Sequence, residues 1–188
     1  MNETRDWQRN REMWTRILET RTGESVGAWN RRIRNQRMSD ESELRVWLSE
    51  RGVTGYAQSL LVMERFGYPD FVTASADELI NAQYADRLAL RPICEAVIDA
   101  AGRLGDVVVQ ARKTYVSLVT PRRTFARVQA TTRKRVDLGL RLDNQAPAGR
   151  LVSSCIHETM KLQIGMSRAE EVDAEVVGWL RRSYVENC

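Results

Sequence analysis

The spacing of the apolar side chains changes once along the chain, and this change limits the possible folds most strongly. In the first part apolar residues recur every three or four positions, as in Leu44, Trp47 and Leu48, which is the spacing of one helix face. Over residues 136–142 they recur at every second position, which is typical of a strand with one apolar face. The sequence therefore predicts helices first and a sheet afterwards.

Short helices fill the N-terminal part, and several carry a recognisable start. Ser25 and Asp40 stand where N-caps are expected, and Ser75 with Glu78 forms the S-x-x-E pattern of a capping box. Because each helix is short, the helices must stabilise one another by packing. We predict an all-helical domain over residues 1–86.

The C-terminal part combines strands with helices. A helix over residues 88–103 comes first, and a second S-x-x-E pattern, Ser167 with Glu170, predicts the start of a last helix. Residues 143–156 lack periodicity and contain proline and glycine, so we expect a mobile loop. The predicted strands are residues 107–109, 114–119, 124–129, 134–142 and, as an edge strand, 160–164.

Short turns between the predicted strands make neighbouring strands antiparallel, because a parallel pair needs a long crossover connection. The fold class that we predict is α+β: a helical N-terminal domain followed by an antiparallel sheet of four to five strands, covered on one face by helices. The second domain spans residues 87–188, and the uncovered face of its sheet carries many arginines.

Composition narrows the class of protein. With 188 residues, 43% of them hydrophobic and 29% charged, the chain has the balance of an ordinary globular protein. No apolar run reaches the roughly 20 residues of a membrane helix, and the first residues are too charged for a secretory signal. The three widely spaced cysteines do not form a disulfide framework, so we expect a cytoplasmic protein.

Positive charge is concentrated in the predicted sheet. Residues 103–150 hold eleven of the 29 Lys and Arg residues but three acidic residues, whereas the whole chain has a net charge of +4. Clustered cations attract anions, and arginine forks fit phosphate and carboxylate groups. We expect the basic turns at 122–123 and 133–135 to border one edge of the sheet. The candidate ligand-binding residues are Arg112, Lys113, Tyr115, Arg122, Arg123, Arg127, Arg133, Lys134, Arg135, Arg141 and His157, with Phe125 interleaved among them.

Cys155, His157 and Glu158 form a C-x-H-E pattern, which could belong to a metal site or a Cys–His pair. Zinc needs three or four protein ligands, and the other thiols, Cys94 and Cys188, are distant in the chain. Phosphate-loop, dinucleotide-binding and HExxH patterns do not occur in the sequence. We therefore expect no metal and no cofactor, and a histidine that forms local hydrogen bonds.

The sequence leaves three functions open. The leading hypothesis is a non-enzymatic protein whose basic sheet face binds a polyanion, with nucleic acid as the first class of partner. The second is a small-molecule binder, acting in sequestration or self-resistance, with a pocket between the sheet, residues 143–156 and the helical domain. The third is an enzyme centred on Cys155 or His157. The same cations also fit a solvated face with basic turns that protect the sheet from edge aggregation.

Two groups of residues resemble known families. One group, in the helical part, comprises Thr22-Gly23-Glu24-Ser25, Trp29, Trp47-Leu48 and residues 52–57 (GVTGYA). This group resembles the bacterial helical family DUF4287. The other group comprises Lys113-Thr114-Tyr115, Thr124-Phe125-Ala126, residues 136–142 (VDLGLRL), Val172-Asp173, Trp179-Leu180 and Tyr184. This group is similar to the DUF5655 family. The resemblance implies a two-domain bacterial protein, and neither family has an assigned activity.

Overall fold

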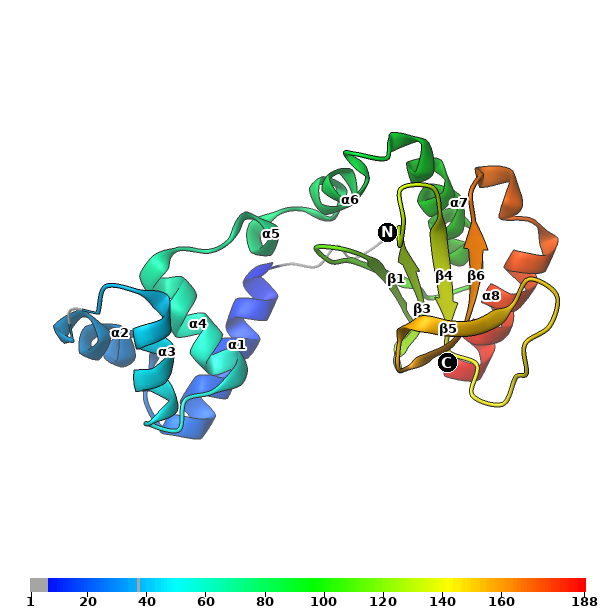
Figure 1. Cartoon of the computed structure of the whole chain (residues 1–188). Helices are drawn as coiled ribbons and strands as arrows, with labels where there is room; N and C mark the ends of the chain where they lie inside the picture. Colours follow the sequence, from blue (N-terminus) through cyan, green and yellow to red (C-terminus); the bar gives the residue numbers. More distant parts are fainter. Residues whose placement is uncertain (1–6, 37) are drawn as a thin grey trace. The chain divides into compact units, whose positions relative to one another are not determined.

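The computed structural model describes residues 7–36 and 38–188, and these residues divide into two compact units. Residues 7–74 form the helical unit and residues 75–188 form the sheet unit (Figure 1). Helices precede an antiparallel sheet and a C-terminal helix, which confirms the predicted α+β class.

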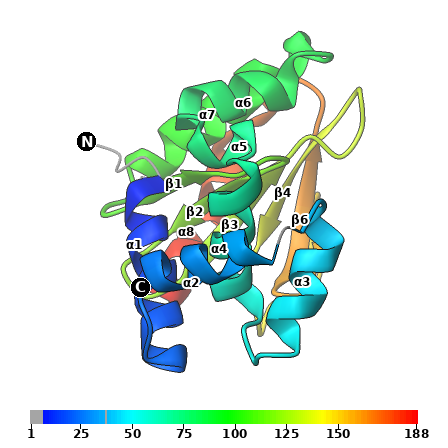
Figure 2. The same cartoon turned by 90° about the vertical axis from the view of Figure 1, so that its left-hand side faces the viewer.

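Helix α4 lies at the centre of the helical unit. It contacts α1, α2 and α3, which are all visible in Figure 2. Its buried residues Ala57, Leu60 and Leu61 recur at helical spacing and pack with Trp14 and Trp29 in one core. The helices of this unit are α1 (Trp7–Thr22), α2 (Val26–Asn35), α3 (Glu41–Ser49), α4 (Gly55–Phe66) and α5 (Asp70–Thr73).

Side-chain caps start several helices where the sequence predicts them. Ser25 accepts a hydrogen bond from the backbone N–H of Ala28, and Asp40 caps α3 in the same way. Ser75 and Glu78 form a complete capping box. Because a cap satisfies an amide group that the first helical turn leaves free, each contributes about 1 kcal/mol.

The sheet unit contains a six-stranded antiparallel sheet in the order β1-β2-β3-β4-β6-β5. Its strands are β1 (Val108–Ala111), β2 (Val116–Val119), β3 (Thr124–Gln129), β4 (Val136–Leu140), β5 (Val152–His157) and β6 (Met160–Met166). Its helical segments are α6 (Ala76–Tyr84), η1 (Leu88–Leu90), α7 (Arg91–Gly102), η2 (Ala169–Glu171) and α8 (Ala174–Asn187).

Strand β5 corrects the sequence prediction in two respects. It occupies the end of the segment 143–156, where a loop is expected, and it pairs with β6, which is therefore not an edge strand. All six of its residues are at least partly exposed, so the strand lacks the apolar alternation that reveals a half-buried strand. The sheet consequently has six strands instead of four to five.

The start of the last helix also differs from the prediction. Asp173, and not Ser167, caps α8, because its side chain accepts hydrogen bonds from the backbone N–H groups of Glu175 and Val176. Ser167 instead donates its backbone N–H to Glu171. The short η2 segment separates the second S-x-x-E pattern from the helix.

Helices α7 and α8 cover one face of the sheet, which we call the inner face (Figure 1). Leu138 and Leu140 of β4 lie there, packed with Val97 of α7 and Leu180 of α8 in one buried core. The period of two in β4 therefore predicts the covered face correctly.

A β-bulge turns Phe125 toward this core. The pairing of β2 with β3 shifts after Leu118, so Phe125 and Ala126 are both buried. The Phe125 ring packs edge-on against Tyr184 of α8, with ring centroids 5.5 Å apart. Phe125 is therefore a core residue and does not interleave with the basic side chains.

The opposite face, which we call the outer face, is only partly open. Strand β5 crosses it next to β4 (Figure 1). A Cβ atom built on Gly139 would lie 3.1 Å from Cβ of Met160 and 3.3 Å from Cδ1 of Ile156, so these side chains cover the glycine. All five residues of β4 are buried, and the expectation of an open second face is wrong at this strand.

Helix α6 belongs to the sheet unit, whereas the sequence places it in the helical domain. Gln83 Nε2 donates to two backbone carbonyls of the β1–β2 turn, at 2.6 and 3.2 Å. Arg87 Nη1 donates to two carbonyls of the β3–β4 turn, at 3.1 and 3.2 Å. Tyr84 is buried in the core of the sheet unit. The structure therefore divides the chain after residue 74, ahead of the expected boundary at 86/87.

Candidate functional site

Strand register aligns polar residues in one row across the outer face. Gln110 pairs with Ser117, Ser117 with Arg127, Arg127 with Gly139, and Gly139 with Gln163. Paired residues in an antiparallel sheet share a face, so the row runs from β1 to β6. The small residues Ser117 and Gly139 stand on either side of Arg127, which is therefore the largest side chain at the middle of the row.

Arg127 is half-buried and lies against Tyr115. Its guanidinium carbon is 3.4 Å from the centroid of the Tyr115 ring. A cation–π contact uses the flat face of the guanidinium, while its N–H groups point outward in the plane. The contact therefore uses none of the N–H groups of Arg127, and its two Nη groups can donate to a planar anion.

Among the described residues no acidic side chain pairs with Arg127, and its Nε atom is buried without a hydrogen-bond partner. Burial lowers the pKa of Arg127 below its ordinary value, and Tyr115 opposes this effect. Arg127 still remains protonated at neutral pH, because the pKa of a guanidinium lies far above neutral pH. The fold thus holds a charge that burial destabilises.

Gln129 follows Arg127 on the same side of β3 and has a buried Oε1 atom without a hydrogen-bond partner in the described part of the chain. We call Tyr115, Ser117, Arg127 and Gln129 the outer-face cluster. It combines one cation with neutral hydrogen-bonding groups. The Arg127 guanidinium, the Ser117 hydroxyl and the Gln129 amide N–H groups can donate to an oxyanion such as phosphate or carboxylate, whereas Gln129 Oε1 only accepts.

Asp137 lies across from Gln129 on β4, yet its charge is used elsewhere. It is 1% exposed, and its Oδ1 lies 3.0 Å from Nε of Arg135. The hydroxyl of Thr131 also donates to Asp137. This buried carboxylate therefore fixes Arg135 and the β3–β4 turn and leaves Arg127 without a counter-charge.

The predicted basic residues do not gather at one edge. Arg112, Lys113 and residues 133–135 lie at turns on one end of the sheet, and Arg122 and Arg123 lie at the other end. Arg141 follows β4 and joins this second end. The expectation of a single basic edge is wrong, because antiparallel strands reverse direction at every turn. The antiparallel order that the sequence predicts already implies that successive turns lie at opposite ends of the sheet.

Several of these cations have partners within the protein. Arg133 Nε lies 3.8 Å from Asp86, and Arg135 pairs with Asp137 as described above. Arg112 Nη2 donates to Gln110 Oε1 at 2.6 Å, and Arg122 Nη1 donates to the carbonyl of Cys188 at 3.4 Å. Among the predicted basic residues, those whose side chains have no hydrogen bond or ion pair with another described residue are Arg123, Arg127, Lys134 and Arg141.

His157 and Cys155 lie on β5. His157 is exposed, and its Nδ1 accepts from the backbone N–H of Thr159 at 3.2 Å and lies 2.9 Å from the Thr159 hydroxyl. The backbone N–H of Cys155 donates to Gln163 Oε1 at 3.1 Å. Over residues 7–36 and 38–188, no three His, Cys, Asp or Glu side chains gather as metal ligands would.

Cys94 lies in the core of the sheet unit, far from solvent. Burial raises the pKa of its thiol to about 11. Because the thiolate is the nucleophilic form, Cys94 is unreactive at neutral pH in the folded protein.

Sequence reasoning named Tyr115 and Arg127 but missed their polar neighbours. Ser117 and Gln129 are absent from the predicted site residues because they are neither charged nor aromatic. Alternation along β3 could have found Gln129, since Arg127 and Gln129 alternate with the buried Ala126 and Val128.

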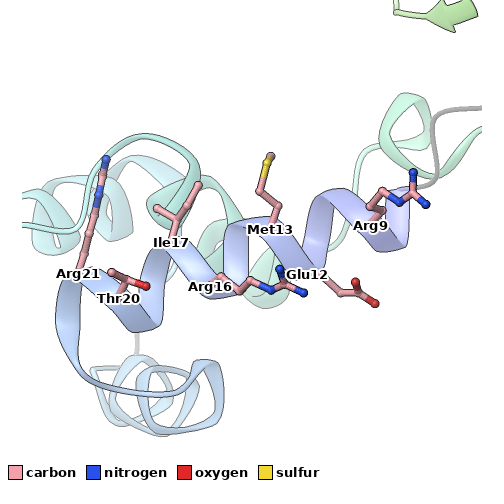
Figure 3. A pocket seen from close by; sticks show the side chains of 7 residues that line it. All are labelled: Arg9, Glu12, Met13, Arg16, Ile17, Thr20 and Arg21. Atoms are coloured by element: carbon pink, nitrogen blue, oxygen red, sulfur yellow. The ribbon is translucent and has the colours of Figure 1, made fainter. Parts of the chain in front are cut away.

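Three surface cavities lie outside the outer-face cluster. The first, of about 380 Å³, follows α1 in the helical unit and is lined by Met13 and Ile17 between arginines (Figure 3). The second, of about 320 Å³, lies between α6, α7 and β1. The third, of about 410 Å³, lies between α8 and residues 148–149, which belong to the expected loop. No helix in the described ranges is long and apolar enough to cross a membrane.

The comparison with protein families identifies the sheet unit. No curated protein and no solved structure matches the chain. Residues 80–187 match the family model described as "Domain of unknown function (DUF5655)". The match begins within α6 and includes the whole sheet and the outer-face cluster. It covers more than half of the chain, and the protein therefore belongs to the DUF5655 family.

Proposed function

We propose that the sheet unit binds a polyanion along the outer face of its sheet, with nucleic acid as the first partner to test. The supporting observation is Arg127, a half-buried cation that stacks on Tyr115 and has no acidic partner in the described part of the chain. Burying a charge without a counter-charge costs folding free energy. An anionic ligand at Arg127 offsets this cost, so the arrangement favours binding.

The distribution of the other cations favours an extended ligand. Lys134 lies at one end of β3, and Arg123 and Arg141 lie at the other end. A strand of six residues such as β3 spans about 20 Å. A chain of phosphates running along β3 would therefore contact a cation at each end and Arg127 in the middle.

Arg127→Met tests this proposal, because methionine keeps an apolar contact with Tyr115 but removes the charge. Arg103→Met is the matched control, since it removes one charge from an exposed position of the same unit. We expect Arg127→Met to weaken binding of a labelled single-stranded oligonucleotide at least tenfold at about 50 mM salt, and to reduce the salt dependence. The control should change the affinity less than about threefold. Fluorescence anisotropy measures both.

Two outcomes contradict the proposal. Equal losses of affinity in both variants would show a general charge effect without a contact at Arg127. An unmodified protein that does not bind the oligonucleotide at about 50 mM salt, where such contacts are strongest, would exclude a nucleic-acid polyanion.

A small anionic molecule is the second candidate ligand. Strand β5 covers Gly139 and restricts the open part of the outer face to the strands beside Arg127, which favours a ligand of limited width. Inorganic phosphate and small dicarboxylates should then raise the melting temperature of the unmodified protein but not that of Arg127→Met. Binding of these anions together with failure of the oligonucleotide would select this candidate.

We also propose that the helical unit is a domain similar to the DUF4287 family, in a cytoplasmic bacterial protein. Two of the residues that carry this resemblance pack in the core of the helical unit. Trp29 is buried, and its Nε1 donates to Oγ1 of Thr22 at 3.1 Å. Trp47 packs edge-on against Trp29, with ring centroids 6.1 Å apart.

A further inference from the structure

The cavity between α6, α7 and β1 lies on the helix-covered side of the sheet unit. Its volume is about 320 Å³, within the range of about 300–1,000 Å³ that is typical of small-molecule sites. Val109 pairs with the buried Leu118 and faces the helices, so this cavity lies on the opposite side of the sheet from the outer-face cluster. A ligand bound here would therefore not compete directly with one at Arg127.

The inner wall of the cavity is apolar. Ile80 of α6 and Ile98 of α7 are half-buried and pack against the core, and Val109 of β1 is 6% exposed. These three side chains come from three separate elements, so the wall is held by the fold of the whole sheet unit. Apolar walls of this kind bind hydrocarbon parts of a ligand.

The rim of the cavity carries an excess of negative charge. Asp77, Glu95 and Asp99 line it, together with one base, Arg91. Arg91 Nε donates to Glu95 Oε1 at 2.8 Å, so this base is already paired. The side chains of Asp77 and Asp99 have neither a hydrogen bond nor an ion pair among the described residues.

Asp99 stands where it lowers the stability of its own helix. It lies near the end of α7, which ends at Gly102. The last turn of this helix contains no basic residue. Carboxylates near a helix C-terminus are disfavoured by the helix dipole. Asp99 is also four residues after Glu95, and like charges at this spacing repel each other. Asp99 is exposed and lies four residues before Arg103, with which it forms no ion pair among the described residues, and a bound cation would offset both effects.

We propose that this cavity binds a small organic cation, with an ammonium or guanidinium group attached to an apolar body of about one ring. The cationic group would pair with Asp99 and Asp77 at the rim. The apolar body would contact Ile80, Ile98 and Val109. Both unfavourable features of Asp99 are then relieved, so the cation stabilises the sheet unit as well as binding to it.

Three ligands with the same ring separate charge recognition from simple hydrophobic binding: benzylamine, benzyl alcohol and benzoate. With the full chain, we expect benzylammonium to bind at least tenfold more tightly than benzyl alcohol, and benzoate to leave the methyl resonances of Ile80 and Ile98 unshifted. Calorimetric titration gives the affinities. The methyl resonances of Ile80 and Ile98 should shift on titration with benzylammonium, which places the ligand in this cavity.

Asp99→Asn tests the rim, and Glu158→Gln is its matched control, because Glu158 is an exposed acid on the β5–β6 turn. We expect Asp99→Asn to weaken benzylammonium binding at least fivefold and to raise the melting temperature of the ligand-free protein. Glu158→Gln should change neither.

Three results would overturn this proposal. The first is no benzylammonium binding at about 10 mM ligand. The second is an equal effect of the three compounds on the methyl resonances of Ile80 and Ile98. The third is an equal loss of affinity in the two variants. None of these results bears on Arg127, because Arg127 lies on the opposite face of the sheet and the resonances of Ile80 and Ile98 report on this cavity.

Discussion

Glu64 in the helical unit and Arg127 in the sheet unit are both half-buried charges, and the pKa of each lies below its ordinary value. The pKa shifts of the two residues have the same direction but opposite causes. Burial favours the neutral form of Glu64, but hydrogen bonds from Tyr68 and Arg11 outweigh it, so the lowered pKa reports a stabilised carboxylate. For Arg127 burial itself lowers the pKa, which reports a destabilised cation.

The partners of the two charges explain this difference. Glu64 Oε1 accepts from Nη2 of Arg11 at 2.8 Å and from the Tyr68 hydroxyl at 2.6 Å, and Oε2 accepts from Asn30 at 3.4 Å. Glu64 thus links α1, α2 and α4 and has a structural role. Arg127 has an aromatic ring beneath it and no acidic partner in the described residues. A buried charge therefore indicates a binding role only when its counter-charge is missing.

The variant with the largest expected loss of stability tests whether the apolar core, and not Arg127, stabilises strand β3. Phe125→Ala removes a fully buried ring two residues before Arg127 and should lower the free energy of unfolding by about 3–5 kcal/mol. Val152→Ala is the control, since Val152 is 48% exposed on β5 and should cost less than about 1 kcal/mol. Urea unfolding of the full chain, followed by circular dichroism, measures both. A small loss for Phe125→Ala would show that the core does not stabilise this strand.

A second pair of variants compares the charge of Glu64 with that of Arg127 through their effects on stability. Arg11→Met leaves Glu64 with its neutral partners alone, and we expect a loss of about 1–2 kcal/mol in the unfolding of the helical unit. Arg127→Met removes a charge without a counter-charge, so the stability of the sheet unit should change by less than about 1 kcal/mol. Urea unfolding followed by tryptophan fluorescence and circular dichroism measures the two variants. If Arg127→Met costs as much as Arg11→Met, Arg127 has a structural role and the comparison fails.

The smallest expected effect is a change in how the free energy of unfolding depends on pH. The pKa of Glu64 is lower in the folded protein than its ordinary value of 4.5, so its contribution to stability is complete above pH 4.5 and is lost as the pH falls through the folded value. Glu64→Gln should remove up to about 1 kcal/mol of this acid sensitivity. Arg127→Met should leave it unchanged, because arginine stays protonated throughout this range. Urea midpoints at about pH 3 and pH 6 measure the difference between each variant and the unmodified protein. Equal acid sensitivity with and without Glu64 would show that its hydrogen bonds do not stabilise the fold.

Much of the fold could be predicted because its signals are local. The caps Ser25, Asp40 and Ser75 act on amide groups within one turn, and each starts a helix in the structure. The alternation in β4 identifies its inner face in the same way. Strand β5 could not be found by this reasoning, since an exposed strand at the sheet edge needs no apolar alternation and exists through its pairing with β6.

The sequence by itself determined the type and order of the elements other than strand β5, and the excess of arginine in the sheet unit. Only the tertiary structure decided which of the arginines without a counter-charge stacks on an aromatic ring. Hydrophobic period and helix caps act over two to four residues, so they can be read along the chain. The counter-charge depends on strand register and side-chain direction: Asp137 turns to Arg135, two residues away, while Arg127 on the neighbouring strand is left with the ring of Tyr115.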